Sequence, residues 1–231
     1  MVTQPLVEGY RWDDEVFAYR VVLEYSGNMK TILCYGDSNT HGANPSGGRW
    51  EYSKRWPGIL ASLLGDEYYV IEEGLGGRTT VFDDPFGVCR NGKTYLPVVL
   101  ATHQPLDLLI ISLGTNDTKR YLGTDERTIA GGIEELATIA KLFEVKQIMV
   151  ISPIHIGPKI EETIFPGFTK ESVAISHKVS DRIKVIAENE GLIFFDAATV
   201  ATYSEIDQLH MDESSHRSLA EALSEVIKTN L

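Results

Sequence analysis

Short apolar runs alternate with longer amphipathic stretches along most of the chain. Five runs are continuously apolar or nearly so: 31–35, 68–71, 108–113, 147–152 and 192–195. Such runs are typical of strands covered on both faces, so they predict a parallel sheet. The stretches between them carry apolar residues three or four positions apart. This spacing predicts helices at 53–64, 95–103, 125–142, 171–190 and 213–228, with Pro97 confined to the first turn of its helix.

Regular alternation of strands and helices predicts an α/β fold, a three-layer α/β/α sandwich with a five-stranded parallel sheet. In such sheets ligands bind at the carboxyl ends of the strands. This rule directs the search for chemistry to the segments that follow the strands. They are 36–41, 73–80, 114–118, 153–168 and 197–210.

Residues 1–28 differ from the rest, with scattered charge, no clear period and a Ser-Gly-Asn break at 26–28. The compact pattern begins at Met29, so we expect an N-terminal extension over 1–28 and one domain over 29–231. The extension is interpreted as a poorly ordered arm or an upstream mis-start. An extra strand or partner contact at 16–25, an apolar stretch, is the alternative.

Composition narrows the classes of function. The chain has 231 residues, 43% of them hydrophobic, which is enough to bury a core. The formal net charge of −12 disfavours nucleic-acid and membrane-surface partners.

No apolar run is long enough to span a bilayer, and early acidic residues do not fit a signal peptide. Two cysteines supply no metal cluster and are consistent with a reduced, cytoplasmic protein.

The first polar segment is Gly-Asp-Ser-Asn-Thr-His-Gly at 36–42, directly after the first strand. Ser38 lies where the chain turns toward a helix, so its hydroxyl is expected to face the crevice. Two alternatives stay open here: an ordinary turn, and a phosphate cradle of the flavodoxin kind. The Gly-x-Ser-x-Gly elbow of α/β-hydrolases is absent because Thr40 replaces the second glycine.

Two further segments offer hydrogen-bond donors. Asn116, after the third strand, is able to aim its amide into a crevice, although, taken alone, a turn or helix cap is the more frequent reason for such a residue. The glycine-rich 73–80 segment lets the backbone approach a ligand closely. It follows the second strand and does not fit Gly-x-Gly-x-x-Gly, so a dinucleotide fingerprint is disfavoured, and no Walker-type loop occurs.

Asp207 and His210 precede the last helix with a spacing that lets the carboxylate meet the imidazole in one tight turn. Alone, this pattern is more often a surface loop or half of a metal site. The other histidines lack such a partner, and His216 is expected on the exposed side of the last helix. Combined with Ser38, the pair would supply a nucleophile, a base and a base-orienter at one sheet edge.

With these segments in order, the sequence from about 30 to 228 resembles the SGNH/GDSL hydrolase family. The matching blocks are Leu-Cys-Tyr-Gly-Asp-Ser at 33–38, Glu-Glu-Gly-Leu-Gly-Gly-Arg-Thr-Thr at 72–80, Leu-Gly-Thr-Asn-Asp-Thr-Lys at 113–119 and Asp-x-x-His at 207–210. The residues of the second and third blocks are most similar to those of the arylesterase and acyltransferase branch. The resemblance implies the flavodoxin-like SGNH fold.

The resemblance also implies residue roles. Ser38 would be the nucleophile, His210 the general base and Asp207 its orienter. The oxyanion hole would consist of the Ser38 and Gly77 backbone N–H groups and the Asn116 side chain. Two departures concern acyl preference: Gln208 stands where many relatives carry glycine, and His41 where acyltransferase-like members often carry a bulky aromatic residue.

The substrate pocket is expected to use Asp37, His41, Ile154 and Phe165. The 153–168 segment is interpreted as a lid, a subunit contact or a loop packed on the core. The resemblance further implies a homo-oligomer that needs neither a metal nor another cofactor.

Three functions remain in competition. The first is a serine esterase for small acyl esters, such as aryl or carbohydrate acetyl esters. The second is an acyltransferase or thioesterase on the same site, which differs in whether the site excludes water. The third is a non-catalytic phosphate or ligand binder that uses the Ser38 loop.

Overall fold

The computed structural model describes residues 29–231, so the predicted extension over 1–28 lies outside the described residues. Five parallel strands form one sheet in the order β2-β1-β3-β4-β5. This order is that of flavodoxin-like sheets, so the predicted fold class is confirmed. The strands are β1 (Lys30–Gly36), β2 (Tyr68–Gly74), β3 (Leu108–Ser112), β4 (Gln147–Ser152) and β5 (Ile193–Asp196).

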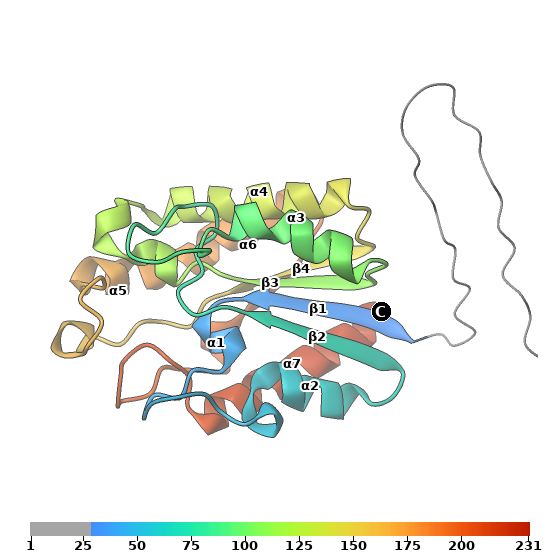
Figure 1. Ribbon diagram of the computed structural model, residues 1–231, viewed down its shortest axis with the longest axis horizontal. Helices are drawn as coiled ribbons and strands as arrows, with labels where there is room; N and C mark the ends of the chain where they lie inside the picture. The colour runs from blue at the N-terminus through green and yellow to red at the C-terminus, as the bar shows by residue number, and fades with distance from the viewer. Residues whose placement is uncertain (1–28) are drawn as a thin grey trace, which may run out of the picture.

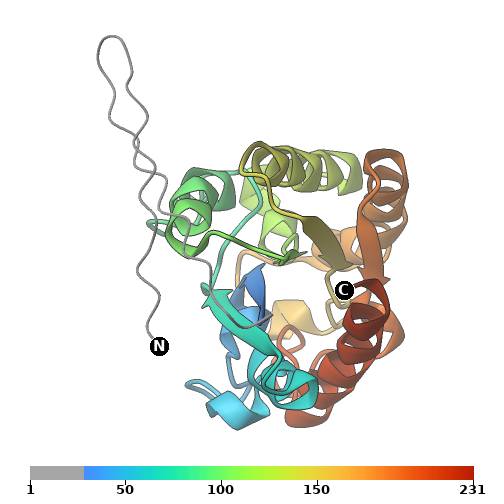
Figure 2. The same ribbon diagram turned by 90° about the vertical axis from the view of Figure 1, so that its right-hand side faces the viewer.

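Helices cover both faces of the sheet (Figures 1 and 2). One face carries α3 (Gly92–His103), α4 (Glu126–Leu142) and α6 (Val179–Glu190), and the opposite face carries α2 (Trp56–Leu64) and α7 (Glu213–Asn230). The short helices α1 (Ser38–His41) and α5 (Lys170–Ser176) lie at the carboxyl end of the sheet. Within the described part of the chain, every helix is too short or too polar to cross a membrane.

Alternate residues of β1 divide the core into two layers. Leu33 and Tyr35 pack with α3, α4 and α6, whereas Ile32 and Cys34 pack with α2 and α7. Because both sides of the strand are buried, its sequence is continuously apolar rather than alternating. The sandwich therefore follows directly from the pattern of the strands.

The helix predicted over 171–190 is two helices, which corrects that prediction. Helix α5 ends at Ser176 and α6 begins at Val179. The Ser176 hydroxyl donates to the Val173 carbonyl and accepts the Ile156 N–H, at 2.7 and 3.1 Å. These side-chain bonds attach α5 to the segment after β4, and such local bonds compete with continuation of a helix.

Helix α3 begins three residues before its predicted start. The Asn91 side chain accepts the Thr94 N–H at 3.3 Å, so the helix starts at Gly92. Pro97 consequently lies inside the helix rather than in its first turn, which corrects the expectation. The side-chain cap fixes the first residue of this helix, and the proline does not.

His216 is buried, not exposed as expected from the sequence. It lies in α7 with 0% of its surface accessible, and its Nδ1 accepts the Trp56 N–H at 3.3 Å. The Trp56 N–H belongs to the first turn of α2, so the imidazole caps a neighbouring helix. Burial lowers the pKa of His216 to about 4, and the side chain is therefore neutral near pH 7.

This buried histidine predicts loss of stability in acid. Between pH 6.5 and about 4 the unfolded chain binds a proton at His216 that the folded chain does not. The free energy of unfolding should therefore fall by about 3 kcal/mol as pH falls through that window. His216→Asn keeps an acceptor for the Trp56 N–H but does not titrate, so urea unfolding at several pH values should show a shallower dependence. His103→Asn is the control, and equal slopes for wild type and His216→Asn would contradict the assignment.

Candidate active site

The Ser38 turn is built at the carboxyl end of β1. Asp37 caps α1, and its Oδ1 accepts the Asn39 N–H at 2.9 Å, which makes Ser38 the first residue of the helix. Gly36 is needed because a Cβ there would lie 2.0 Å from Thr40 Oγ1. The turn therefore presents a serine, 8% exposed, at the edge where all strands end.

Asp207 and His210 form a pair within one turn, as the spacing predicted. Asp207 Oδ1 accepts the N–H groups of Leu209 and His210, at 3.0 and 2.9 Å. Its Oδ2 lies 2.6 Å from His210 Nδ1. Burial alone would raise the pKa of Asp207, but the hydrogen bonds from His210 outweigh it and the pKa is lowered. The ionised carboxylate holds the proton on Nδ1 and leaves Nε2 as an acceptor.

Gln208 locks this turn to the segment that follows β4. The residue adopts φ +62°, the left-handed region that favours glycine. Its Oε1 accepts the Lys159 N–H at 3.2 Å, and its carbonyl accepts the Gly157 N–H at 2.8 Å. Its Nε2 donates to Glu205. These bonds secure a conformation that glycine would adopt more readily.

The Ser38 turn and the turn that contains Asp207 and His210 are joined by a hydrogen bond between neighbouring residues. The backbone N–H of Met211 donates to Asn39 Oδ1 at 2.9 Å, although the two residues are 172 positions apart. This bond joins the residue after Ser38 to the residue after His210. The Phe165 ring packs edge-on against the His210 ring, with centroids 5.5 Å apart. In residues 29–231 no hydrogen bond joins Ser38 directly to His210, and such bonds often form only when a substrate is bound.

The predicted oxyanion donors lie on the adjoining strand ends. Asn116 is 4% exposed, and its Nδ2 donates to the Arg78 carbonyl at 3.2 Å and to Asp37 Oδ2 at the long distance of 3.5 Å. Gly77 adopts φ +82° in the turn after β2. The described residues offer no acceptor to the backbone N–H of Ser38 or of Gly77. Both groups are thus available to a ligand.

A buried carboxylate joins two of these loops. Asp117 Oδ1 accepts the Thr80 N–H at 2.9 Å and also accepts its hydroxyl. Asp117 is 0% exposed, and burial raises its pKa to about 6 despite the bonds from Thr80. The carboxylate therefore fixes the loop that contains Gly77 against the loop that contains Asn116.

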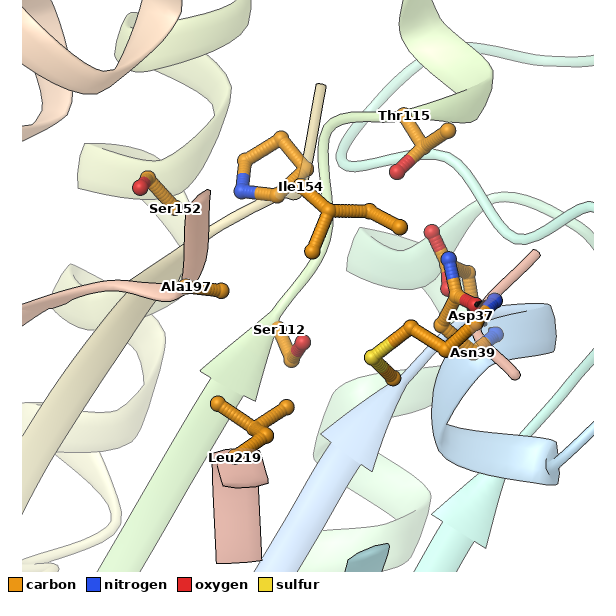
Figure 3. A pocket seen from close by; sticks show the side chains of 10 residues that line it. Asp37, Asn39, Ser112, Thr115, Ser152, Ile154, Ala197 and Leu219 are labelled. Atoms are coloured by element: carbon orange, nitrogen blue, oxygen red, sulfur yellow. Dashed lines mark hydrogen bonds between the residues drawn. The ribbon is translucent and has the colours of Figure 1, made fainter. Parts of the chain in front are cut away.

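A small cavity lies behind the Ser38 turn (Figure 3). Asp37 and Asn39 lie on one side of it, with Ser152 and Ala197 opposite. Of the four predicted pocket residues, Asp37 and Ile154 line this cavity, Phe165 contacts His210, and His41 does neither. The other lining residues are Ser112, Thr115, Pro153, Met211 and Leu219.

Most of the apolar side chains in the 153–168 segment pack inward. Ile156, Ile160 and Phe168 form a buried cluster with Leu209, the residue before His210. Ile164, by contrast, is 86% exposed. Of the three interpretations of this segment, a loop packed on the core describes most of its length.

Comparisons with known proteins identify a family and similar structures. The model of the GDSL-like lipase/acylhydrolase family matches residues 34–217. The structure of Est24, a carbohydrate acetylesterase from Sinorhizobium meliloti, is 34% identical in sequence with a TM-score of 0.84, covering 87% of this chain and 100% of its own. The aryl esterase of M. smegmatis is 36% identical with a TM-score of 0.82 and the same coverages. A search of curated proteins gives no match.

Asp117 predicts a pH effect opposite in sign to that of His216. Between pH 3.8 and about 6 the folded chain keeps a proton on Asp117 that the unfolded chain releases, so stability falls as pH rises through that window. Asp117→Asn still accepts the Thr80 N–H and stays neutral. Relative to wild type, its free energy of unfolding should increase by about 2–3 kcal/mol between pH 4 and pH 7 in urea titrations. An unchanged difference would show that Asp117 titrates normally.

Proposed function

The chain belongs to the GDSL-like lipase/acylhydrolase family and is a carboxylic ester hydrolase, and from that premise we propose that it cleaves small acyl esters through Ser38, His210 and Asp207. The observation that supports this assignment most directly is the Asp207–His210 pair, fastened beside the Ser38 turn by the hydrogen bond from Met211 to Asn39. A base with a fixed tautomer beside a serine is the arrangement that activates a hydroxyl.

The first half of the reaction forms an acyl-enzyme. His210 Nε2 accepts the proton of the Ser38 hydroxyl as its oxygen attacks the ester carbonyl carbon. The carbonyl oxygen becomes an oxyanion that receives hydrogen bonds from the Ser38 N–H, the Gly77 N–H and Asn116 Nδ2. The carbon–oxygen bond to the alcohol then breaks, and His210 returns its proton to the leaving oxygen.

The second half releases the acid. Water gives a proton to His210 Nε2 and attacks the acyl carbon, which again forms an oxyanion. Collapse breaks the bond to the Ser38 oxygen, and that oxygen takes back the proton. Asp207 stays ionised throughout and stabilises the imidazolium that forms in each half.

Asn116 has the freedom that this role requires. One hydrogen of its Nδ2 is directed to the Arg78 carbonyl at 3.2 Å, whereas the 3.5 Å contact with Asp37 is long for a hydrogen bond. A substrate oxygen competes with the weaker of the two contacts. The amide is therefore positioned by one bond and available through the other hydrogen.

The proposed substrates are aryl or carbohydrate esters of short acids such as acetate. The carbohydrate acetylesterase and the aryl esterase of similar structure support this class. Self-association and a cytoplasmic location stay predictions of the sequence.

Labelling of Ser38 tests the proposal. An organophosphate should add once, to Ser38, as identified by mass spectrometry of the peptide. Ser38→Ala and His210→Ala should each lower kcat for p-nitrophenyl acetate by roughly 10⁴–10⁶-fold, since the members of a triad act as one unit. Exposed Ser214→Ala is the control. Wild-type kcat in Ser38→Ala, or labelling elsewhere, would refute the assignment.

Asn116→Ala tests the oxyanion site separately. The variant keeps the nucleophile and base, so the organophosphate should still modify Ser38, but more slowly. The kcat for p-nitrophenyl acetate should fall about 10²–10³-fold, the usual effect of losing one oxyanion donor. A loss of less than about threefold would remove Asn116 from the mechanism.

A further inference from the structure

We propose that Arg78 is the positioning residue of the oxyanion site, which it holds in register through both its side chain and its backbone. This inference rests on the proposed function and adds a residue to it. Arg78 directly follows Gly77 and is only 2% exposed. It has no carboxylate partner within 4 Å among the residues that the structure describes.

The guanidinium connects the carboxyl ends of two strands. Its Nη1 donates to the carbonyl of Gly36 at 2.9 Å and also to the carbonyl of Glu73. Gly36 ends β1, two residues before Ser38, and Glu73 is the residue before the last of β2, ahead of the loop that contains Gly77. One planar group thus bonds to the ends of the two strands that precede two of the three proposed donors.

Aromatic packing fixes the guanidinium. Its carbon lies 4.1 Å from the centroid of the Tyr35 ring and 5.5 Å from that of Tyr95. The Tyr35 hydroxyl donates to the Gly92 carbonyl at 2.7 Å, so this ring is itself held at both ends. A planar cation on a fixed ring has little freedom to rotate away from its carbonyl acceptors.

The backbone of Arg78 completes the arrangement. Its N–H donates to the Leu75 carbonyl at 3.1 Å, which closes the turn that contains Gly77. Its carbonyl accepts from Asn116 Nδ2 at 3.2 Å. The same residue therefore contacts all three elements of the oxyanion site: the end of β1, the Gly77 turn and the Asn116 amide.

The chemistry argues against a purely structural role. A buried cation costs folding free energy unless it is paired or hydrogen-bonded, and an apolar side chain fills such a space at lower cost. Here the partners are two neutral carbonyls and a ring face, and Nε has no partner among the described residues. The arrangement is less stable than an apolar side chain would be, but it ties the turn that contains Gly77 to the end of β1.

Arg78→Lys tests the proposal, with Arg55→Lys as the matched control. Arg55 is also buried, but its guanidinium pairs with Glu72 at 2.8 Å and does not contact the oxyanion loops. Lysine keeps the charge yet lacks the planar fork. Both variants should melt at lower temperature, but only Arg78→Lys should lose kcat, by about 10–100-fold, with KM changed less than about threefold.

Two readouts separate positioning from folding. The acid limb of the pH dependence of kcat/KM should not move, because the Asp207–His210 pair is untouched. In Arg78→Ala, millimolar guanidinium chloride should restore part of the lost kcat, and it should do nothing for Arg55→Ala. If Arg78→Ala does not fold, Tyr35→Leu removes the stacking ring while keeping the guanidinium, and it should lower kcat in the same direction.

The outcomes also distinguish this inference from the proposed function. Absence of an organophosphate adduct on Ser38 in the wild-type protein would overturn the proposed function, and this inference with it. If the wild type is labelled at Ser38, wild-type kcat in Arg78→Lys with a melting temperature as low as that of Arg55→Lys would overturn only the role of Arg78. A lower kcat without rescue by guanidinium and with a shifted pH profile would likewise contradict it.

Discussion

The candidate site depends on one constraint: the strands of the sheet are parallel, and β1, β2 and β3 end at paired positions. Gly36 at the end of β1 pairs with Gly74 of β2 on one side and with Ser112 of β3 on the other. The segments that leave these three strands carry Ser38, Gly77 and Asn116. The proposed nucleophile follows the middle of these three strands, so the other two proposed donors flank it. Glycine at the level ends also lets α1 approach closely, since a Cβ on Gly74 would lie 2.1 Å from the His41 nitrogen.

Strand register alone does not fix side-chain geometry, and buried polar groups supply the rest. Asp117, Arg78 and Asn39 each connect loops that lie far apart in the chain, mostly by bonding to backbone groups. Backbone donors and acceptors move little once strands are paired, so they are firm anchors. Burial of these charged or polar side chains lowers the stability of the fold unless they form hydrogen bonds. These three buried polar groups lie at the carboxyl end of the sheet, whereas the layers between sheet and helices are mostly apolar, with the buried His216 of α7 as an exception.

The sequence was sufficient for features with local causes. Continuous apolar runs predicted all five strands, and the three-residue spacing predicted the contact of Asp207 with His210. Features that depend on distant partners were missed. The break at 177–178 reflects bonds between Ser176 and the segment after β4, and the burial of His216 reflects α2 packing over α7. The Arg78 acceptor at Gly36 is 42 positions away, a distance at which no pattern in the chain indicates a contact.

The segment after β4 also holds the turn that contains Asp207 and His210. Gly157 and Lys159 form hydrogen bonds with Gln208. Leu209 packs against Ile156, Ile160 and Phe168. Both residues between Asp207 and His210 are therefore held by this segment. Gln208 adopts a left-handed conformation that costs a non-glycine residue about 1 kcal/mol or more. Its side-chain bonds to Glu205 and Lys159 offset part of that cost, and the second of these depends on the segment after β4. Phe165, whose ring packs against that of His210, belongs to the same segment. The segment and the turn that contains His210 are therefore physically coupled, and a glycine at position 208, which has no side chain to bond to Lys159, would weaken that coupling.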